Sequence, residues 1–215
     1  MTDLWSRRAE AFRVSPTHAS GEDLELVVEW CEPGDGVTVL DVATGGGHVA
    51  RRLREEGCTV VTVDPAPGMQ ADVVGRAEDL PFADASFDAV ACRIAPHHFT
   101  DVVTAMREMA RVARDRVVVE DNVFFDAQSE EAERLRDPTH VRCYSEPEWR
   151  SFFELAGLDV VAERRFDRRV PLEGWLERVE TPADDATRVK ELLAHRIEGD
   201  TLAMATVVLK GKKNA

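Results

Sequence analysis

A strand, a glycine-rich turn and the start of a helix follow one another between residues 37 and 50, where the sequence reads VTVLDVATGGGHVA. The apolar run ends in Asp41, and Gly45 and Gly47 allow a sharp turn at which a ligand can approach the main chain. The helix that follows offers free N–H groups. Turns of this kind hold adenosine cofactors. Gly45, Gly47 and Ala50 also satisfy the dinucleotide pattern G-x-G-x-x-G/A, so the turn alone leaves the cofactor open.

A second carboxylate stands where an adenosine site needs one. The apolar run CTVVTV, residues 58–63, is typical of a buried strand and ends in Asp64, 17 residues after Gly47. A carboxylate at this place in a β-α-β unit accepts hydrogen bonds from both ribose hydroxyls. Asp41 and Asp64 are therefore expected at the same edge of the sheet.

The rest of the chain alternates between patterns typical of helices and of strands. We expect a loop at residues 15–20 and helices at residues 4–12, 21–32, 48–56, 106–112, 146–156, 172–179 and 186–195. Strands are expected at residues 37–41, 58–63, 71–75, 87–92, 116–119, 158–163 and 202–209. This alternation predicts one α/β domain spanning residues 1–215, with a mainly parallel sheet covered on both faces.

Composition excludes several classes of protein. Asp and Glu outnumber Lys and Arg by 41 to 27, and the resulting charge of −14 argues against a nucleic-acid partner. The sequence has no stretch of about 18 apolar residues and no signal peptide, so no membrane span and a cytoplasmic location are expected. The scattered cysteines and histidines form no C-x-x-C or H-x-x-x-H pair, so buried reduced thiols and no metal site are expected.

Several segments together resemble a known family. VLDVATGGGHVA, VVTVDPAPGM and AEDLPFADASFDAVACRIAPHHF occur in this order and are similar to the class I S-adenosylmethionine-dependent methyltransferases. AEDLPF, CRIAPHHF and RDPTHVR resemble the branch related to quinone-biosynthesis methyltransferases. The resemblance implies a Rossmann-like three-layer α/β sandwich, with a mostly parallel sheet of seven or slightly fewer strands and an antiparallel last strand. It also implies S-adenosyl-L-methionine as the cofactor and a small-molecule methyl acceptor.

The resemblance also assigns residues to parts of the cofactor. The methionine end would be lined by Asp41, Ala43, Gly45 and Gly47, and Asp64 would hold the ribose. Ala77 and Glu78 would border the adenine, with Pro65 and Met69 beside it. Arg93 to Ala95 would lie beside the methyl group, and His18 would belong to a lid formed by residues 1–20.

The sequence departs from the family pattern at three places. Arg76 replaces an Asp that usually accepts a hydrogen bond from the adenine amino group, and Arg has no acceptor to offer. Glu78 could substitute for it. The interval from Asp64 to Ala77 is short, which predicts that the helix between the second and third strands is lost or reduced to a turn. Arg114 and Asp115 replace the usual Pro-Gly-Gly turn.

Three residues are candidates for catalysis. His140 lies in RDPTHVR, within a substrate-side cap predicted at residues 124–149, where a neutral imidazole could take a proton from the acceptor. Of His97 and His98, one is expected to face the pocket, and we place His98 there. Asp121 follows the fifth strand and could serve as a base or as a substrate anchor. For each of the three, a purely structural role remains the alternative.

The leading hypothesis is methyl transfer to a small organic acceptor. A nicotinamide oxidoreductase is the rival suggested by the glycine pattern, but Tyr144 is followed four residues later by Glu148 and not by the Lys of short-chain dehydrogenases. A protein that binds the cofactor without methyl transfer is the third hypothesis. Exposed Trp5 or Trp175 could support a homodimer.

Overall fold

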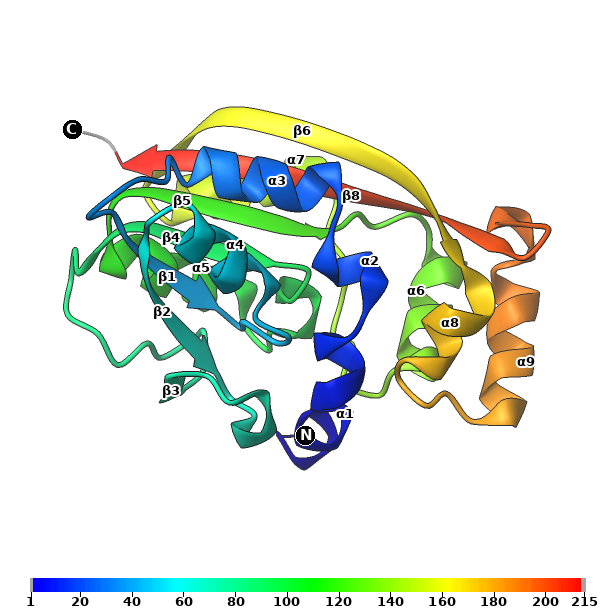
Figure 1. Ribbon diagram of the computed structural model, residues 1–215. Helices are drawn as coiled ribbons and strands as arrows, with labels where there is room; N and C mark the ends of the chain where they lie inside the picture. The colour runs from blue at the N-terminus through cyan, green and yellow to red at the C-terminus, as the bar shows by residue number, and fades with distance from the viewer. Residues whose placement is uncertain (1, 214–215) are drawn as a thin grey trace.

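A single twisted sheet organises the molecule. The computed structural model describes residues 2–213 (Figure 1). Along the sheet the strands have the order β3-β2-β1-β4-β5-β8-β6, and the short β7 pairs with β8. Their bounds are β1 Thr38–Val42, β2 Thr59–Asp64, β3 Val73–Val74, β4 Phe87–Arg93, β5 Ala113–Asn122, β6 Leu158–Pro171, β7 Ile197–Glu198 and β8 Thr201–Lys213.

The strand directions confirm the predicted fold class. Strands β1 to β5 pair in parallel, whereas β8 is antiparallel to both of its long neighbours, β5 and β6. The sheet has eight strands, one more than predicted, because the two-residue β7 pairs with the start of β8. Since parallel strands end at the same edge, Asp41 and Asp64 come together there, as do the segments that follow β4 and β5.

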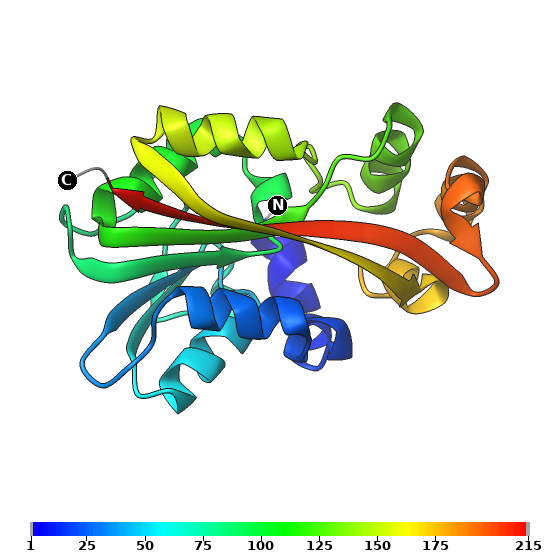
Figure 2. The same cartoon turned by 90° about the horizontal axis from the view of Figure 1, so that it is seen from above.

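Helices cover both faces of the sheet (Figure 2). On one face, α3 (Glu22–Trp30) and α4 (His48–Glu55) bury Val27 and Leu53. On the other, α5 (Val102–Val112) and α7 (Glu146–Leu155) bury apolar side chains that include Met106 and Trp149. Each helix presents one apolar stripe, which must be buried against the sheet. The result is the predicted three-layer arrangement.

A small helical lobe projects from the far end of β6 and β8 (Figures 1 and 2). It contains α6 (Ala127–Arg136), α8 (Leu172–Glu177) and α9 (Ala183–Leu192), followed by the short turn Ala194–Arg196. Its own apolar cluster includes Trp175, Val189 and Leu202. The predicted cap segment, residues 124–149, contributes α6 to this lobe, and the remaining elements come from residues much later in the chain.

The N-terminal helices lie across the carboxyl edge of the parallel strands. Helix α1 (Thr2–Arg13) contacts the short turn Pro67–Met69: the Gly68 N–H donates to Ser6 Oγ at 3.0 Å, and Arg13 donates to the Gly68 carbonyl at 2.6 Å. The predicted shortening between β2 and β3 is confirmed, because only this turn stands in place of a helix. Helix α2 (Pro16–Ala19) corrects the loop predicted at residues 15–20.

Two further predictions about elements were wrong. Strand β6 runs to Pro171 and not to Glu163, because its charged residues pair along β8 through backbone hydrogen bonds that do not depend on an apolar pattern. Helix α6 was missed because its sequence, AQSEEAERLR, has only a weak apolar stripe. Trp175 is 3% exposed inside the lobe, so it cannot support the homodimer suggested for it.

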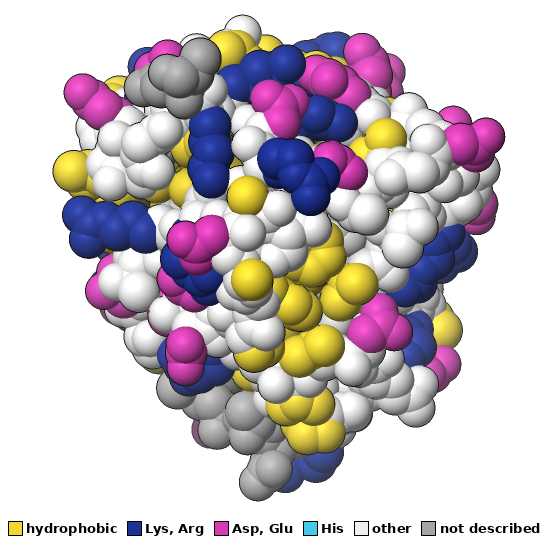
Figure 3. Space-filling model, turned by 90° about the vertical axis from the view of Figure 1, so that its left-hand side faces the viewer, with side chains coloured by type: hydrophobic (Ala, Val, Ile, Leu, Met, Phe, Trp, Pro, Cys, Tyr) yellow, Lys and Arg dark blue, Asp and Glu magenta, His cyan; other side chains and the backbone are white. Residues whose placement is uncertain are grey.

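The face opposite the lobe carries mixed charges around a group of hydrophobic side chains (Figure 3). Lys and Arg alternate there with Asp and Glu, without a continuous basic surface on this side. Among residues 2–213, no helix has the length and apolar character needed to cross a membrane. All four cysteines are buried and unpaired, as predicted.

Candidate functional site

The glycine turn after β1 forms one wall of a large cavity. Gly45 and Gly47 have positive φ angles of 52° and 75°, which glycine adopts without steric cost. Gly46 has a different constraint: a Cβ there would lie 2.7 Å from the Phe12 carbonyl oxygen of α1. The middle glycine, which the sequence pattern did not single out, therefore allows α1 to lie directly over the turn.

Nine of the ten residues predicted for the cofactor line this cavity. The tenth, Gly47, does not line the cavity and is the N-cap residue of α4. The nine that do are Asp41, Ala43, Gly45, Asp64, Pro65, Met69, Ala77, Glu78 and Arg93. Gly46 and Thr44 of the turn also line it, as do Trp5 and Phe12 of α1. Neither aromatic residue was predicted as a cofactor contact, because no local pattern places α1 beside the turn.

Asp64 is held at the carboxyl end of β2 by the backbone. Its Oδ2 accepts the Gly45 N–H at 3.0 Å, and its Oδ1 accepts the Ala66 N–H at 2.9 Å. Burial raises the pKa of this carboxyl, whereas the two N–H groups lower it. A carboxylate has about four acceptor positions, so about two remain for further donors.

Asp41 lies at the carboxyl end of β1 and is more deeply buried than Asp64. Its Oδ2 accepts from the Thr44 hydroxyl at 2.5 Å and from the Ala50 N–H at 3.2 Å. Burial raises the pKa of Asp41 to about 6, although both hydrogen bonds lower it. No cation pairs with it among the described residues, so a positively charged ligand group would favour its ionised form.

Polar contacts around Glu78 form another part of the cavity wall. Its Oε1 accepts from the N–H and the hydroxyl of Thr100, at 2.9 and 2.8 Å, and from Arg76 at 3.2 Å. Arg76 also donates to the Thr100 hydroxyl at 2.9 Å. The Arg that departs from the family pattern thus binds Glu78 and joins the wall of the cavity.

Arg93 links the cavity to the N-terminal helices. Its guanidinium donates to Glu120 at 2.7 Å, to Asp23 at 2.5 Å and to the carbonyl of His18 at 2.9 Å. The side chain is 4% exposed. Arg93 lines the cavity, and its charge is already neutralised by two carboxylates.

A second cavity adjoins the first. Many of its residues come from β5, β6, β8 and the helical lobe, and they include Asn122, Arg168, Met204 and Trp175. The two cavities share five wall residues: Trp5, Phe12, His18, Ile94 and His98. Side chains of the N-terminal helices thus stand between them.

His98 has a defined tautomer in the shared wall. Its Nδ1 lies 3.0 Å from the carbonyl oxygen of Thr139, and because a carbonyl can only accept, Nδ1 must carry the proton. The other nitrogen, Nε2, is then the acceptor. Burial holds the pKa of His98 well below its ordinary value of 6.5, so the ring is neutral near pH 7. A neutral imidazole with a free acceptor nitrogen can take a proton from a bound molecule.

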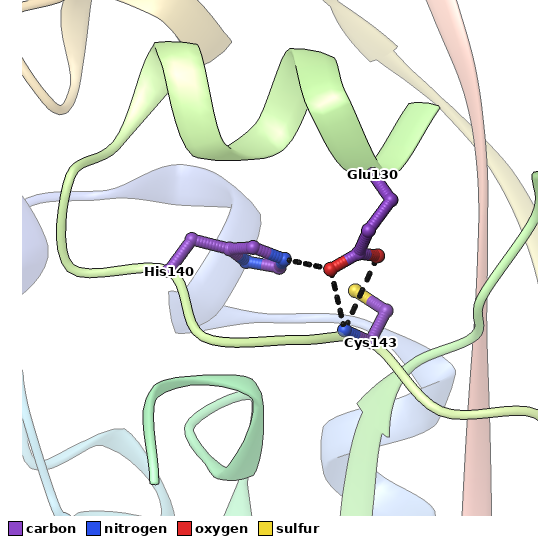
Figure 4. Close-up of side chains that lie close together, drawn as sticks. All are labelled: Glu130, His140 and Cys143. Atoms are coloured by element: carbon purple, nitrogen blue, oxygen red, sulfur yellow. Dashed lines mark hydrogen bonds and ion pairs between the residues drawn. The ribbon is translucent and has the colours of Figure 1, made fainter. Parts of the chain in front are cut away.

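His140 lines neither cavity, although it was predicted to lie in the pocket. Its Nε2 lies 2.8 Å from Glu130 Oε1, and the Cys143 N–H contacts both carboxylate oxygens at 3.3 Å (Figure 4). The neighbouring residue, Thr139, lines the first cavity in its place. The fold thereby brings three side chains of metal-ligating type within 4.8 Å, which no spacing in the sequence indicated. The His140 ring and the Cys143 N–H both bind Glu130, which already accounts for the burial of that carboxylate.

Asp121 is also absent from both cavity walls. It is fully buried, and its Oδ1 lies 2.5 Å from Nδ1 of His97. Burial raises the pKa of Asp121 well above its ordinary value and lowers that of His97 to about 3. The predicted base or substrate anchor is instead a partner that orients His97, which itself lines the second cavity.

The comparisons with known proteins agree with this geometry. Residues 40–119, which contain the turn, Asp64 and β4, match the family model described as a methyltransferase domain. The uncharacterized methyltransferase YcgJ of Bacillus subtilis is 35% identical over an alignment that covers 89% of this chain and 83% of the relative. A demethylmenaquinone methyltransferase of Beutenbergia cavernae is 38% identical over 89 residues, which is 37% of each protein.

The solved structures agree as well. The crystal structure of YcgJ from Bacillus subtilis superposes with a TM-score of 0.79 and 27% identity, and the match covers 89% of this chain and 98% of that one. The similarity therefore extends well beyond residues 40–119. The chain belongs to the S-adenosylmethionine-dependent methyltransferases of the methyltransferase-domain family.

Proposed function

We propose that this protein transfers a methyl group to a small organic acceptor, with the cofactor in the first cavity and the acceptor in the second. The observation that carries the proposal is the wall that the two cavities share, because it contains His98 with a free acceptor nitrogen. Direct transfer needs the acceptor atom to reach the methyl carbon where the two cavities adjoin, and holding both molecules there lowers the entropic part of the barrier.

The residues of the first cavity suit S-adenosylmethionine. Asp64 retains acceptor positions for two ribose hydroxyls, and Asp41 lacks the positive partner that a methionine ammonium group would supply. Ala77 and Glu78 border the end at which an adenine would lie. When bound, this cofactor supplies a methyl group on positively charged sulfur, a reaction that needs no metal ion.

His98 is proposed as the general base. Its Nε2 would accept the proton that an O, N or C acceptor loses as it attacks the methyl carbon, while Thr139 fixes the ring through Nδ1. The low pKa of His98 keeps the ring unprotonated and available, although it limits the strength of the base. His18, the other imidazole in the shared wall, lies 2.8 Å from the Ser15 hydroxyl through its Nδ1 and could assist it.

Binding measurements test the proposal directly. Calorimetric titration with S-adenosylmethionine, S-adenosylhomocysteine and NAD is expected to show binding of the first two only. Incubation with methyl-labelled cofactor and a cell extract should then give a labelled small molecule. Binding of NAD alone would support the nicotinamide alternative, and binding of S-adenosylmethionine without any labelled product would support a role without methyl transfer.

Two histidine variants separate catalysis from structure. In His98→Asn the amide nitrogen can still donate to the Thr139 carbonyl, but no base remains, so turnover should fall by about 10² to 10⁴ while cofactor binding is kept. In His140→Gln the amide nitrogen can still donate to Glu130, and turnover should stay near that of the unmodified protein. Steady-state kinetics would check both variants. Unchanged turnover in His98→Asn would remove His98 from catalysis.

A further inference from the structure

The second cavity has an unusual charge for so acidic a protein. The chain carries a net charge of −14, yet three guanidinium groups line this cavity: Arg136 at the end of α6, Arg168 on β6, and Arg178 directly after α8. Asp137 is the only carboxylate among the cavity residues that the structure describes. The excess of positive charge is therefore a local product of the fold.

Carboxylates already pair with two of these three arginines. Arg136 donates to Glu133 at 3.1 Å, and Arg168 contacts Asp23 at 3.3 Å. Asp23 also pairs with Arg93 at 2.5 Å, so the negative charge of Asp23 is divided between Arg93 and Arg168.

Asp137 is not free to neutralise the third arginine. Its Oδ1 accepts from Arg8 at 3.2 Å, and from the N–H and the hydroxyl of Thr139 at 3.0 and 2.7 Å. The three carboxylates Glu133, Asp23 and Asp137 are therefore all paired with cations other than Arg178.

Arg178 is the one of these three arginines that has no carboxylate partner among the described residues. Among the described residues its one hydrogen bond is to the Thr17 hydroxyl, at 3.1 Å from Nη2. Burial and the positive charges of Arg136 and Arg168 lower the pKa of Arg178 to about 10. A cation that is partly buried, repelled by two others and unpaired is unfavourable unless an anion joins it.

The rest of the cavity indicates the shape of the missing partner. Val170, Val179 and Met204 supply apolar surface. Asn122 lines the same cavity, and its buried Oδ1 has no hydrogen-bond partner among the described residues. The imidazoles of His18 and His98 lie in the wall toward the first cavity. Such a site suits a small molecule with an apolar body, a hydrogen-bond donor and one anionic group.

We propose that the methyl acceptor is such an anion, and that Arg178 binds its carboxylate or phosphate oxygens. This inference rests on the proposed function for the identity of the second cavity as the acceptor site. Arg178 is a specificity-determining residue in this account, because a neutral acceptor would leave its charge unpaired. The anion would also join the lobe to α2 through the Arg178–Thr17 contact.

Three small probes test the charge preference. Benzoate, phenyl phosphate and benzamide would each be titrated into the full-length protein saturated with S-adenosylhomocysteine, with calorimetry as the readout. At least one of the two anions should bind about ten- to a hundredfold more tightly than neutral benzamide, the scale of a hydrogen bond to a charged group. The stronger of the two would identify the anionic group. Equal binding of all three probes would overturn the proposal.

Variants of one position assign the preference to Arg178. Arg178→Gln should abolish it, and Arg178→Lys, which keeps the charge but loses the planar fork, should retain part of it. Arg169→Gln is the matched control, because Arg169 lies on the same strand as Arg168 and pairs with Glu198 outside the cavity. An anion preference that survives in Arg178→Gln would contradict the assignment. Unchanged thermal unfolding would establish that each variant is folded.

A fractionated extract separates this proposal from the proposed function. Anion exchange would divide the extract into anionic and remaining small molecules, and each fraction would be incubated with protein and methyl-labelled cofactor. Label is expected in the anionic fraction, and its absence there would overturn the anionic acceptor. Label in the other fraction alone would contradict an anionic acceptor and would still support methyl transfer to a small molecule. Failure to bind S-adenosylmethionine would instead contradict the proposed function, and probe titrations repeated without S-adenosylhomocysteine would still decide the charge preference.

Discussion

Two aspartates at the ends of neighbouring strands have different surroundings, and this difference suits different parts of one ligand. Asp64 accepts two backbone N–H groups, each on a separate oxygen, which orients its carboxylate rigidly. Asp41 directs its hydrogen bonds to one oxygen and lies deeper, so its charged form is the more strongly disfavoured. Asp64 is thus suited to neutral hydroxyl donors, and Asp41 to a cation.

Replacement of Asp64 tests the ribose assignment. Asp64→Ala should weaken the binding of S-adenosylmethionine by about 1.5 to 3 kcal/mol, because two hydrogen bonds to a charged group are lost. Asp64→Asn should weaken it less, since one oxygen acceptor remains. Calorimetry measures both affinities. An unchanged dissociation constant in Asp64→Ala would exclude the ribose role.

The affinity for the cofactor should also depend on pH through Asp41. Its pKa is raised to about 6, so its charged form predominates above that pH and is lost as the pH falls. Cofactor affinity should be constant above about pH 7 and then decrease below about pH 6, by at most about tenfold per pH unit. Calorimetry between about pH 5 and about pH 8 measures the profile.

Asp41→Asn provides the control for that profile. The variant should bind the cofactor more weakly at neutral pH and lose the dependence near pH 6. Because the folded-state pKa is raised, the contribution of Asp41 to stability is complete below its ordinary pKa of 3.8 and is lost as pH rises through 6. The neutral Asn should therefore not lower the free energy of unfolding at pH 7. A profile that is the same in both proteins would assign the titration to another group.

At the scale of elements, the contact of α1 with the glycine turn determines the shape of the first cavity. Gly46 faces the Phe12 carbonyl, and Gly68 faces the Ser6 backbone, where a Cβ would lie 2.6 Å from Ser6 Cα. Two glycines thus allow the helix to approach closely on both sides of the cavity. The aromatic side chains of Trp5 and Phe12 reach the cavity wall as a consequence.

Gly46→Ala should displace α1 and weaken cofactor binding. The new Cβ would meet the Phe12 carbonyl oxygen at 2.7 Å, and a backbone atom cannot rotate away as a side chain can. Faster hydrogen exchange at residues 2–13 and a lower affinity in calorimetry are the expected results. Gly47→Asn is the control, because Gly47 has a left-handed φ that Asn tolerates and nothing within 4 Å of its Cβ position. Exchange rates in Gly46→Ala equal to those of the unmodified protein would contradict this role.

At the scale of the whole molecule, buried ion pairs connect elements that are distant in sequence. Arg93 on β4 joins Asp23 on α3 to Glu120 on β5, and Arg168 on β6 contacts the same Asp23. Burial raises the pKa of Glu120 to about 7, even though Arg93 lowers it. The network lies between the sheet and the N-terminal helices, so it fixes their relative position at the cavity.

The four buried thiols report on unfolding in different parts of the molecule. Cys31 and Cys58 belong to the core on one face of the sheet, Cys92 belongs to the other, and Cys143 lies beside α6. Burial raises the pKa of the Cys31, Cys92 and Cys143 thiols, which disfavours the reactive thiolate. A thiol reagent such as Ellman's should therefore react slowly with the native protein and rapidly with all four cysteines in denaturant. Rapid labelling of the native protein would reveal a part that opens independently.

The sequence by itself predicted the parallel half of the sheet and nine of the residues that line the first cavity. Apolar runs specify buried strands, glycines specify the turn, and Asp41 and Asp64 directly end such runs, so their positions follow from local chemistry. The local signal was weaker for α6 and for the second half of β6. There, an apolar stripe is nearly absent, and pairing with distant residues decides the structure.

Only the tertiary structure decided which candidate side chains reach the cavities. The sequence made His98 and His140 equally suitable candidates. In the structure Thr139 binds the His98 ring in the shared wall, whereas Glu130 binds the His140 ring, which lines neither cavity. Arg178 became notable only when the fold had placed the available carboxylates beside other cations. The physical reason is that burial and pairing depend on contacts between segments far apart in the chain, and no local pattern encodes those contacts.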